Sequence, residues 1–292
     1  MEGVETNLKK YLHREMKAKA VFCILGDKEK KTMKKLTVAL LVFVFLLSAC
    51  SIAPLETVTG SGKMVTKSFV VQDFDQIRIG TSGVLYIEQG DEFSLSIEAD
   101  DNILPLLDVE VEQGVLTLRT EPDITPLQFE TIIYRVTLPE LSMIDLSSSA
   151  DVRVEDFSAD SLSVDINGSG DVTFVNLDVA SLAVRISGSG DMILPNVSAK
   201  TVLAEINNSG LMDVAGKTET LTVKVSGSGD LLADALKAST VEVAVNGSGD
   251  VTVWAVDTLD VSISGSGNVQ YLGAPELTEK ISGSGDLTQF GN

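Results

Sequence analysis

Histidine and cysteine are almost absent from this sequence of 292 residues. The single histidine, His13, and the two cysteines, Cys23 and Cys50, all lie within the first 50 residues. Residues 51–292 therefore cannot form a Ser-His-Asp triad, a Cys-His pair or a zinc site with His and Cys ligands. They cannot form a disulfide either, so packing alone must stabilise the domain, and the chain is long enough for that.

Aromatic and basic side chains are also scarce. Trp254 is the only tryptophan, and aromatic residues make up 5% of the chain, which leaves few platforms for stacking a sugar ring. A single tryptophan beside a corner is more often part of the packing than a glycan shelf, and we favour packing here. The chain has 22 Lys and Arg against 42 Asp and Glu. Because phosphate contacts need Lys and Arg, we predict no nucleic-acid partner.

One long apolar run is present, within the stretch MKKLTVALLVFVFLLSAC at residues 33–50. Two lysines, a short apolar run and small residues are typical of a secretory signal. The final LSAC resembles the bacterial lipoprotein signal, in which the cysteine is acylated, so we predict a lipid on Cys50. The alternative is an uncleaved transmembrane helix. It would need about twenty apolar residues and would leave the LSAC sequence without a purpose.

This signal divides the chain. We interpret residues 1–49 as an N-terminal extension and lipoprotein signal peptide, with the true start at Met33, and residues 50–66 as a lipid-anchored linker. Loss of residues 1–49 removes 10 of the 22 basic and 5 of the 42 acidic residues, which leaves 12 and 37 and a net charge of −25. We expect the protein in the bacterial cell envelope, extracytoplasmic. Its partner there is the membrane, either the outer membrane or the outer face of the cytoplasmic membrane, reached through the lipid on Cys50.

A motif of the form Ser/Asn-Gly-Ser-Gly-Asp returns about every twenty residues in the second half of the chain. The residue before each Gly-Ser-Gly, or its counterpart, is Ser147, Asn167, Ser187, Asn207, Ser226, Asn246, Ser264 and Ser282. The steps between these residues are 20, 20, 20, 19, 20, 18 and 18. Self-similarity of this length is the signature of a solenoid.

Apolar and polar residues alternate within each repeat, which indicates half-buried strands and not helices. Three short apolar segments follow one another in each unit, so we predict three short strands per turn. Such turns make an all-β fold, a parallel β-helix over residues 143–292 with about twenty residues per rung, stacked at about 4.8 Å. Stacking predicts three inward columns. The first is Val164, Val184, Ala204, Val223, Val243 and Val261. The second is Ile166, Ile186, Ile206, Val225, Val245, Ile263 and Ile281, and the third is Val172, Met192, Met212, Leu231, Val251, Val269 and Leu287.

The outward residues between the first two columns predict a ladder of alternating charge. They are Asp165, Arg185, Glu205 and Lys224, followed by Ala244 and Ser262. Opposite charges on neighbouring strands contribute about 0.2–1 kcal/mol each. The ladder also favours the correct register, because a slip of one rung would bring two acidic residues together.

Two glycines recur in each corner, and we interpret them as structural. A chain that turns sharply between strands needs residues with positive φ, which glycine adopts without steric cost. Asn208 replaces the first glycine once, and Asn tolerates the left-handed region well. Ala150 replaces the second glycine once. The predicted corner glycines are Gly168, Gly170, Gly188, Gly190, Gly227, Gly229, Gly247, Gly249, Gly265 and Gly267.

Calcium binding is the competing interpretation of these corners. Repeats rich in Gly and Asp wind around calcium in β-rolls, and the weak metal candidates here are Asp171, Asp191, Asp230 and Asp250. A calcium site needs six to eight oxygens, whereas each rung has one Asp and Leu211 interrupts the column. We therefore predict no metal and no other cofactor. The Asp side chains should be solvated and accept hydrogen bonds from turn amides.

Residues 67–142 have longer and more varied strand patterns. A distant copy of the repeat, IRIGTSGVLYIEQG, lies at Ile77–Gly90. We expect hairpin-like breaks at Gln89-Gly90-Asp91 and at Gln113-Gly114, and one helical turn near Pro105. We predict that this irregular β-rich region caps the open end of the solenoid, which would otherwise expose apolar columns and unpaired strand edges.

Taken together, these features resemble one known family. The lipoprotein start, the opening FDQIRIGTSGVLYIEQG, the step SLSIEADDNILPLL and the serial S/N-G-S-G-D units are similar to the family "putative auto-transporter adhesin, head GIN domain". The resemblance covers essentially the whole chain after Cys50. It implies a right-handed parallel β-helix exported to the cell surface, and it implies no established biochemical function.

We therefore expect a lipid-anchored, non-enzymatic protein that serves as a scaffold for surface adhesion or binding, with a glycan or a protein as its ligand. No catalytic residue is assigned. The alternative is a carbohydrate-active enzyme, a polysaccharide lyase or glycoside hydrolase, on the same scaffold. An enzyme would require a groove with clustered Arg, Lys and Asp, whereas a binding scaffold would present a flat face without them. The sequence leaves the oligomeric state open.

Overall fold

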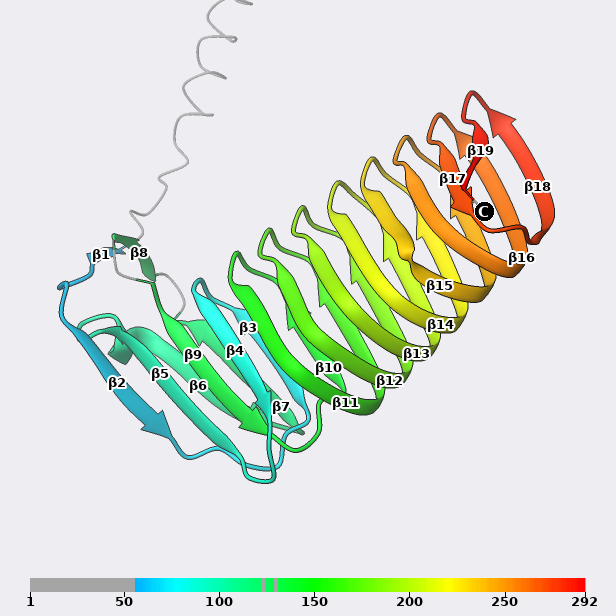
Figure 1. Ribbon diagram of the computed structural model, residues 1–292. Helices are drawn as coiled ribbons and strands as arrows, with labels where there is room; N and C mark the ends of the chain where they lie inside the picture. Colours follow the sequence, from blue (N-terminus) through cyan, green and yellow to red (C-terminus); the bar gives the residue numbers. More distant parts are fainter. Residues whose placement is uncertain (1–55, 122–123, 129–130, 292) are drawn as a thin grey trace, which may run out of the picture. The chain divides into compact units, whose positions relative to one another are not determined.

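The computed structural model describes residues 56–121, 124–128 and 131–291. This part of the chain consists of β-strands and their connections, apart from one 3₁₀ turn, η1 (Leu104–Leu106). Strands β10 to β19 stack in parallel as a solenoid (Figure 1). They are β10 (Met143–Leu146), β11 (Asp151–Ile166), β12 (Val172–Ile186), β13 (Met192–Ile206), β14 (Leu211–Val225), β15 (Asp230–Val245), β16 (Val251–Gly265), β17 (Val269–Leu272), β18 (Glu276–Gly283) and β19 (Leu287–Gly291). The predicted all-β solenoid is confirmed.

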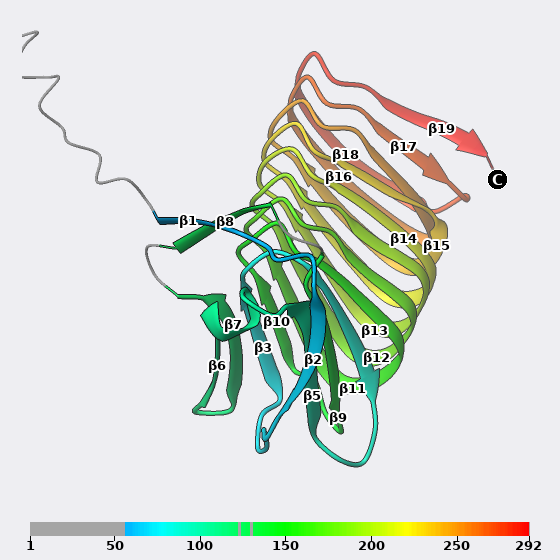
Figure 2. The same ribbon diagram turned by 90° about the vertical axis from the view of Figure 1, so that its left-hand side faces the viewer.

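Each full turn contains one long bent strand and a Gly-Ser-Gly corner, and not the three separate strands that we predicted. In β12 the alternation of buried and exposed side chains breaks at residues 175–176 and at 180–181, where two successive side chains are exposed. Both breaks are bends, and pairing with β11 resumes directly after each. Neighbouring turns bend at the same places, so the strands stay paired on both sides of each bend (Figure 2).

All three predicted inward columns are confirmed as rows of paired residues on successive turns. Their members are buried through β16 and at Val269 of β17. The last described turn differs, because no further turn covers it. Ile281 is 42% exposed, and Leu287 is only partly buried.

Differences in turn length are absorbed at the bends. Paired residues of β11 and β12 lie 20 positions apart throughout. Between β13 and β14 the separation falls from 20 to 19 across a bulge, where Gly216 lies opposite Val197 with φ at +130°. Between β15 and β16 it falls from 20 to 17 and then settles at 18. The segments between the bends therefore keep their inward columns in register, while the number of residues at the bends differs from turn to turn.

The distant copy of the repeat is itself part of the solenoid. Its strands, β3 (Gln76–Gly80) and β4 (Val84–Gln89), pair in parallel with β10 and β11. One further parallel layer follows, in which β7 (Val115–Thr120) pairs with β3 and β9 (Ile133–Leu138) pairs with β4. Strands β3 and β4 therefore lie between two parallel layers. Strands β7 and β9 lie on one side of them, and β10 and β11, which begin the longer stack, lie on the other side.

Antiparallel strands lie beyond this last parallel layer. Strand β6 (Leu107–Glu112) pairs with β7, β5 (Ser94–Asp100) pairs with β9, and β2 (Met64–Phe69) pairs with β5, all antiparallel. These strands lie at the opposite end of the solenoid from β17 to β19 (Figures 1 and 2). Because their direction is reversed, they do not offer an edge that continues the parallel repeat.

One of the two predicted hairpin-like breaks is confirmed. Gln113 and Gly114, with φ at 53° and 82°, connect the antiparallel pair β6 and β7. The break at Gln89-Gly90-Asp91 is not a hairpin, because β9 lies between β4 and β5. The helical turn near Pro105 is present as η1.

The interpretation of residues 50–66 as a linker is wrong for its described part. Strand β1 (Glu56–Thr59) pairs in parallel with β8 (Ile124–Gln128), and β2 begins at Met64. Between them, the Ser61 hydroxyl donates to the carboxylate of Asp101 at 2.6 Å, and the Asn102 amide donates to the Thr59 carbonyl at 2.7 Å. Contacts with residues some forty positions away fix this segment, and sequence patterns cannot show them.

Candidate functional site

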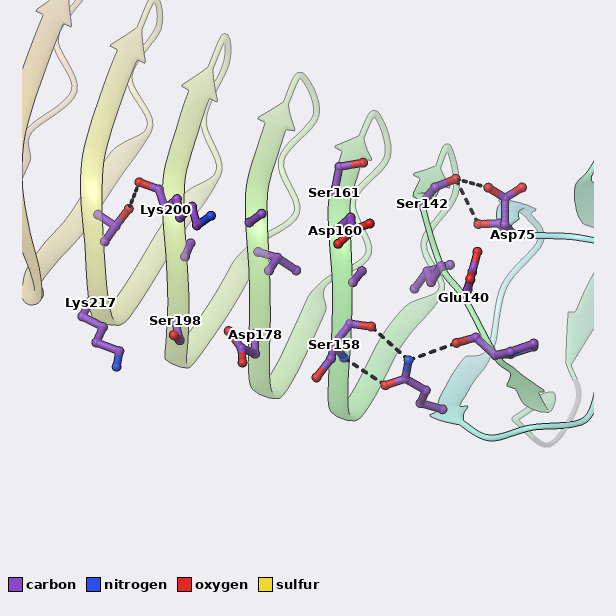
Figure 3. A pocket seen from close by; sticks show the side chains of 18 of the residues that line it. Asp75, Glu140, Ser142, Ser158, Asp160, Ser161, Asp178, Ser198, Lys200 and Lys217 are labelled. Atoms are coloured by element: carbon purple, nitrogen blue, oxygen red, sulfur yellow. Dashed lines mark hydrogen bonds between the residues drawn. The ribbon is translucent and has the colours of Figure 1, made fainter.

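A groove of about 940 Å³ lies along one side of the solenoid, over β11 to β14 (Figure 3). Its floor consists of the segment between the two bends of each strand, with small residues at equivalent positions in successive turns. These residues are Ala159, Val179, Ala199 and Thr218. The loop at residues 139–142 forms the wall at the end nearest β4.

The groove exists because the turn before β11 is incomplete. Strand β4 ends at Gln89, and the chain then leaves the solenoid toward β5, so at Ser158 strand β11 is paired with β12 on one side and has no strand on the β4 side. The Gln89 side-chain amide takes the place of that strand. It donates to the Ser158 carbonyl at 2.9 Å and accepts from the Ser158 N–H at 3.0 Å. The same amide nitrogen donates to the Pro139 carbonyl at 3.0 Å, which fixes the loop that walls the groove.

The end of the groove beside this loop is acidic. Asp75 accepts a hydrogen bond from the Ser142 hydroxyl at 2.6 Å, and Glu140, Asp160 and Asp178 also line this end (Figure 3). The carboxylates come from elements far apart in the sequence.

The other end of the groove carries Lys200 and Lys217. On the next turn, Lys237 is paired with Lys217, and the following turn places Trp254 beside Lys237. The Lys237 ammonium lies 5.5 Å from the centre of the Trp254 ring, and this ring is partly buried. Like charges opposite each other in a sheet are destabilising by about 0.2–1 kcal/mol. Sequence reasoning missed these lysines, although alignment of the repeats puts Lys217 and Lys237 in one column.

The predicted charge ladder is confirmed on a different face. Arg185 contacts Asp165 and Glu205, each at 2.9 Å, and the Lys224 ammonium contacts Glu205 at 3.0 Å. The hydrogen bond from Lys224, and then that from Arg185, holds the pKa of Glu205 below its ordinary value. Glu205 in turn, with the charge of Asp165, raises the pKa of Arg185.

The ten predicted corner glycines do lie in the corners, but the conformational reason that we gave is wrong for nine of them. Only Gly265, with φ at +151°, has a positive φ of the kind that excludes side chains. Asn208 is not left-handed either, and its side chain donates to the Ser187 carbonyl at 3.2 Å.

Close approach of stacked corners accounts for the glycines instead. A Cβ atom on Gly188 would lie 1.8 Å from the Gly168 carbonyl oxygen, and one on Gly190 would lie 2.0 Å from the Gly170 carbonyl oxygen. Both distances are far below any van der Waals contact, so a side chain requires the backbone to shift. The stack of carbonyl groups, and not the local turn, excludes Cβ.

The Asp column forms a ladder of hydrogen bonds that runs along the solenoid. Each carboxylate accepts the backbone N–H of the equivalent residue on the next turn. Asp171 accepts from Asp191 at 2.8 Å, Asp191 accepts from Leu211 at 2.9 Å, and Asp230 accepts from Asp250 at 2.7 Å. Asp250 accepts from Asn268 at 2.9 Å. We predicted turn amides as donors, and the structure shows that each donor belongs to the neighbouring turn.

All four weak metal candidates therefore have one carboxylate oxygen occupied by a backbone donor. In the described ranges, no three His, Cys, Asp or Glu side chains lie close enough to hold a metal ion. The same ranges contain no helix long and apolar enough to cross a membrane. Cys50, the predicted lipidation site, lies outside the described residues.

Three solved structures share this fold over 80% of the chain. One is described as a "putative lipid binding protein" from Parabacteroides distasonis, with 24% identity, a TM-score of 0.76 and 100% of its own length covered. Another is a "putative adhesin" from Parabacteroides merdae, with 23% identity, a TM-score of 0.76 and 99% coverage. A third is a "putative adhesin" from Bacteroides fragilis, with 26% identity, a TM-score of 0.63 and 100% coverage. No curated protein matches the chain.

The family match agrees with the resemblance seen in the sequence. It extends over residues 73–275, which includes β3 to β17 and the whole groove. The chain belongs to the family described as "putative auto-transporter adhesin, head GIN domain".

Proposed function

We propose that this protein is a non-enzymatic, lipid-anchored binding protein of the bacterial cell envelope, which holds a surface ligand in the groove over β11 to β14. The groove is the observation that carries the proposal. It is open, lined by polar side chains, and built on stacked strands that are paired with their neighbours along the floor of the groove. Preformed concave sites with convergent polar groups are the usual form of a ligand site. The names of the family and of two of the structural neighbours support a surface role.

A binding array of glycans and matrix proteins tests this proposal, with the Ser51–Asn292 fragment as the probe. The variant Ala180→Trp places a bulky side chain in the groove at an exposed position. The matched variant Ala183→Trp places the same side chain on another face of the same strand. We expect a ligand that binds the wild type and Ala183→Trp but not Ala180→Trp. Equal binding by all three proteins would place the ligand elsewhere, and no binding to the wild type would contradict the function.

The anchor rests on the LSAC sequence that ends at Cys50. Metabolic labelling with a fatty-acid analogue should mark the wild type and leave Cys50→Ser unlabelled. The Cys23→Ser variant is the matched control and should be labelled like the wild type. Equal labelling of the wild type and Cys50→Ser would contradict lipidation at this residue.

A polysaccharide lyase is the second candidate, because the site is a groove and not a flat face, and because it contains both lysines and carboxylates. These are residue types that we expected of an enzyme. Incubation of the fragment with an acidic polysaccharide tests this candidate. An increase in ultraviolet absorbance from unsaturated products, lost in Lys200→Gln and Lys217→Gln, would replace the non-enzymatic proposal. Constant absorbance supports binding without cleavage.

A further inference from the structure

The lysines at one end of the groove stand out from the other basic residues of this acidic chain. Lys200, Lys217 and Lys237 lie on three consecutive turns, and Trp254 lies on the fourth. We call these four residues the basic strip. None of its lysines has a carboxylate within 4.0 Å among the described residues, and the contact of Lys237 is with the Trp254 ring. Glu219 also lines the groove, on the same turn as Lys217, without forming such an ion pair.

Elsewhere in the described part, basic residues mostly have acidic partners. Carboxylates lie within 4.0 Å of Lys63, Arg78, Arg119, Arg135, Arg185 and Lys224. Of the rest, Lys67 lies over the Phe69 ring, and Arg153 and Lys280 belong to strands at other places in the fold. Among the described residues, only in the basic strip do lysines without a carboxylate partner gather, and there Lys217 and Lys237 face each other as like charges. Fold stability does not account for this arrangement.

The position of Trp254 also departs from the repeat. Strand β16 lacks counterparts for the three residues that follow Ala233 in β15, and this shortening puts Trp254 directly opposite Lys237. A turn of ordinary length would put a different residue there. The only tryptophan of the chain thus continues the column of Lys217 and Lys237 beyond the end of the groove.

We propose that the basic strip binds an acidic polysaccharide, one that carries carboxylate or sulfate groups, laid along the solenoid axis. This inference rests on the proposed binding function and assigns its ligand class. Alternate turns are about 10 Å apart, close to the length of a disaccharide in an extended chain, so lysines can meet charges that recur every one or two sugars. The partly buried Trp254 ring lies beside the Lys237 ammonium, so a polymer that contacts Lys237 also comes close to the ring, and Ser198 lines the groove near Lys200.

A nucleic acid fits this surface less well. It carries one charge about every 3.4 Å along each strand, and three lysines cannot match that density in a chain with a net charge of −20. A polysaccharide has sparser charge and offers hydroxyl groups to the neutral and acidic side chains of the groove.

Tryptophan fluorescence of the full chain in detergent tests the assignment, because Trp254 is the only tryptophan. The probes are polygalacturonate and chondroitin sulfate, with dextran as the neutral polymer. The strip variant is Lys200→Gln/Lys217→Gln/Lys237→Gln. The control variant, Lys67→Gln/Arg153→Gln/Lys280→Gln, loses the same charge at three other exposed places that lack ion pairs within the described residues.

We expect at least one acidic polymer to change the fluorescence of the wild type and the control saturably, and dextran to change neither. In the strip variant the affinity should fall about tenfold or more, and the dependence of log Kd on log salt should become shallower, since fewer cations contact the polymer. The assignment is wrong if neither acidic polymer binds the wild type, or if the strip variant binds as well as the control. A neutral glycan or a protein that binds wild type and strip variant equally on the array would keep the proposed function and overturn the ligand class.

Discussion

At the scale of single residues, the corners show that glycine is required by the neighbouring turn. The backbone of Gly190 is not left-handed, so alanine could adopt its conformation in isolation. Its Cβ would nevertheless overlap the Gly170 carbonyl oxygen of the turn below. The second glycine of each corner is buried, whereas the serine between the two glycines is exposed. The space along the solenoid axis, and not the local backbone conformation, therefore limits the side chain at these positions.

The variant Gly190→Ala should reduce the free energy of unfolding by about 1–3 kcal/mol, the usual cost of overpacking a tight interior. Its neighbour provides the control. Ser189→Ala removes only an exposed hydroxyl, and we expect a change below about 0.5 kcal/mol. Chemical denaturation measures both values. If Ser189→Ala proves the more damaging, the corner has a role for the serine that close packing of glycines does not provide.

At the scale of elements, side chains couple neighbouring strands in two ways. On one face, Asp165, Arg185, Glu205 and Lys224 join four successive turns through ion pairs. In the corners, Asp carboxylates join successive turns through backbone N–H groups. Both ladders require the correct stacking register, because a displaced turn would lose its charge partner or its donor.

The ion pairs of Glu205 predict a pH-dependent contribution to stability. Lys224 and Arg185 lower the pKa of Glu205 in the folded state. A carboxylate with a lowered folded pKa stabilises the fold above its unfolded pKa, and this stabilisation is lost as the pH falls through the folded value. Glu205→Gln should therefore cost up to about 1 kcal/mol at neutral pH, and this cost should shrink as the pH falls below the ordinary glutamate pKa and through the lowered pKa of the folded state.

Denaturation of both proteins across this pH range checks the prediction. The control is Glu242→Gln, an exposed glutamate on the next turn but one after Glu205 that forms no ion pair in the described part of the chain. A difference between Glu205→Gln and wild type that stays constant from neutral to acid pH would show that the ion pairs do not contribute.

Strand β18 carries a charged residue in one of the columns that is apolar in the preceding turns. In β18, Glu279 occupies the inward column that Val261 fills in the preceding turn. A charged residue at an inward position of an edge strand discourages pairing with another sheet. Glu279→Val should therefore increase self-association, which sedimentation velocity at several protein concentrations will detect. Glu242→Val, with the same change at an outward position of β15, should sediment like the wild type. No increase for Glu279→Val would show that the edge is protected in another way.

At the scale of the whole molecule, the fold should not depend on calcium. The Asp carboxylates of the corners already accept backbone hydrogen bonds, and the core columns are apolar from β11 to Val269. We expect the same β-type circular dichroism spectrum and nearly the same melting temperature in chelator and in millimolar calcium. A spectrum that forms only with calcium would identify the corners as metal sites, since metal-dependent folds are unstructured without their ion.

The sequence by itself determined the solenoid, its period, its three inward columns and the charge ladder. These features follow from the alternation of apolar and polar residues within a repeat of about twenty residues. Because successive repeats stack, residues one period apart lie next to each other on neighbouring turns. The family resemblance followed from the same residues. Even the changes in turn length could be read from the spacing of the Gly-Ser-Gly units.

Only the tertiary structure decided where the groove lies and why the corners contain glycine. The groove depends on Gln89, which contacts Pro139 and Ser158 at separations of 50 and 69 residues, and no periodic pattern encodes such contacts. The docking of residues 56–63 depends in the same way on distant partners. The glycines depend on a carbonyl oxygen of the preceding turn, and the Asp column depends on an N–H of the following turn. A repeat predicts which turns are neighbours, whereas the distance between their backbones is fixed only when the turns are packed.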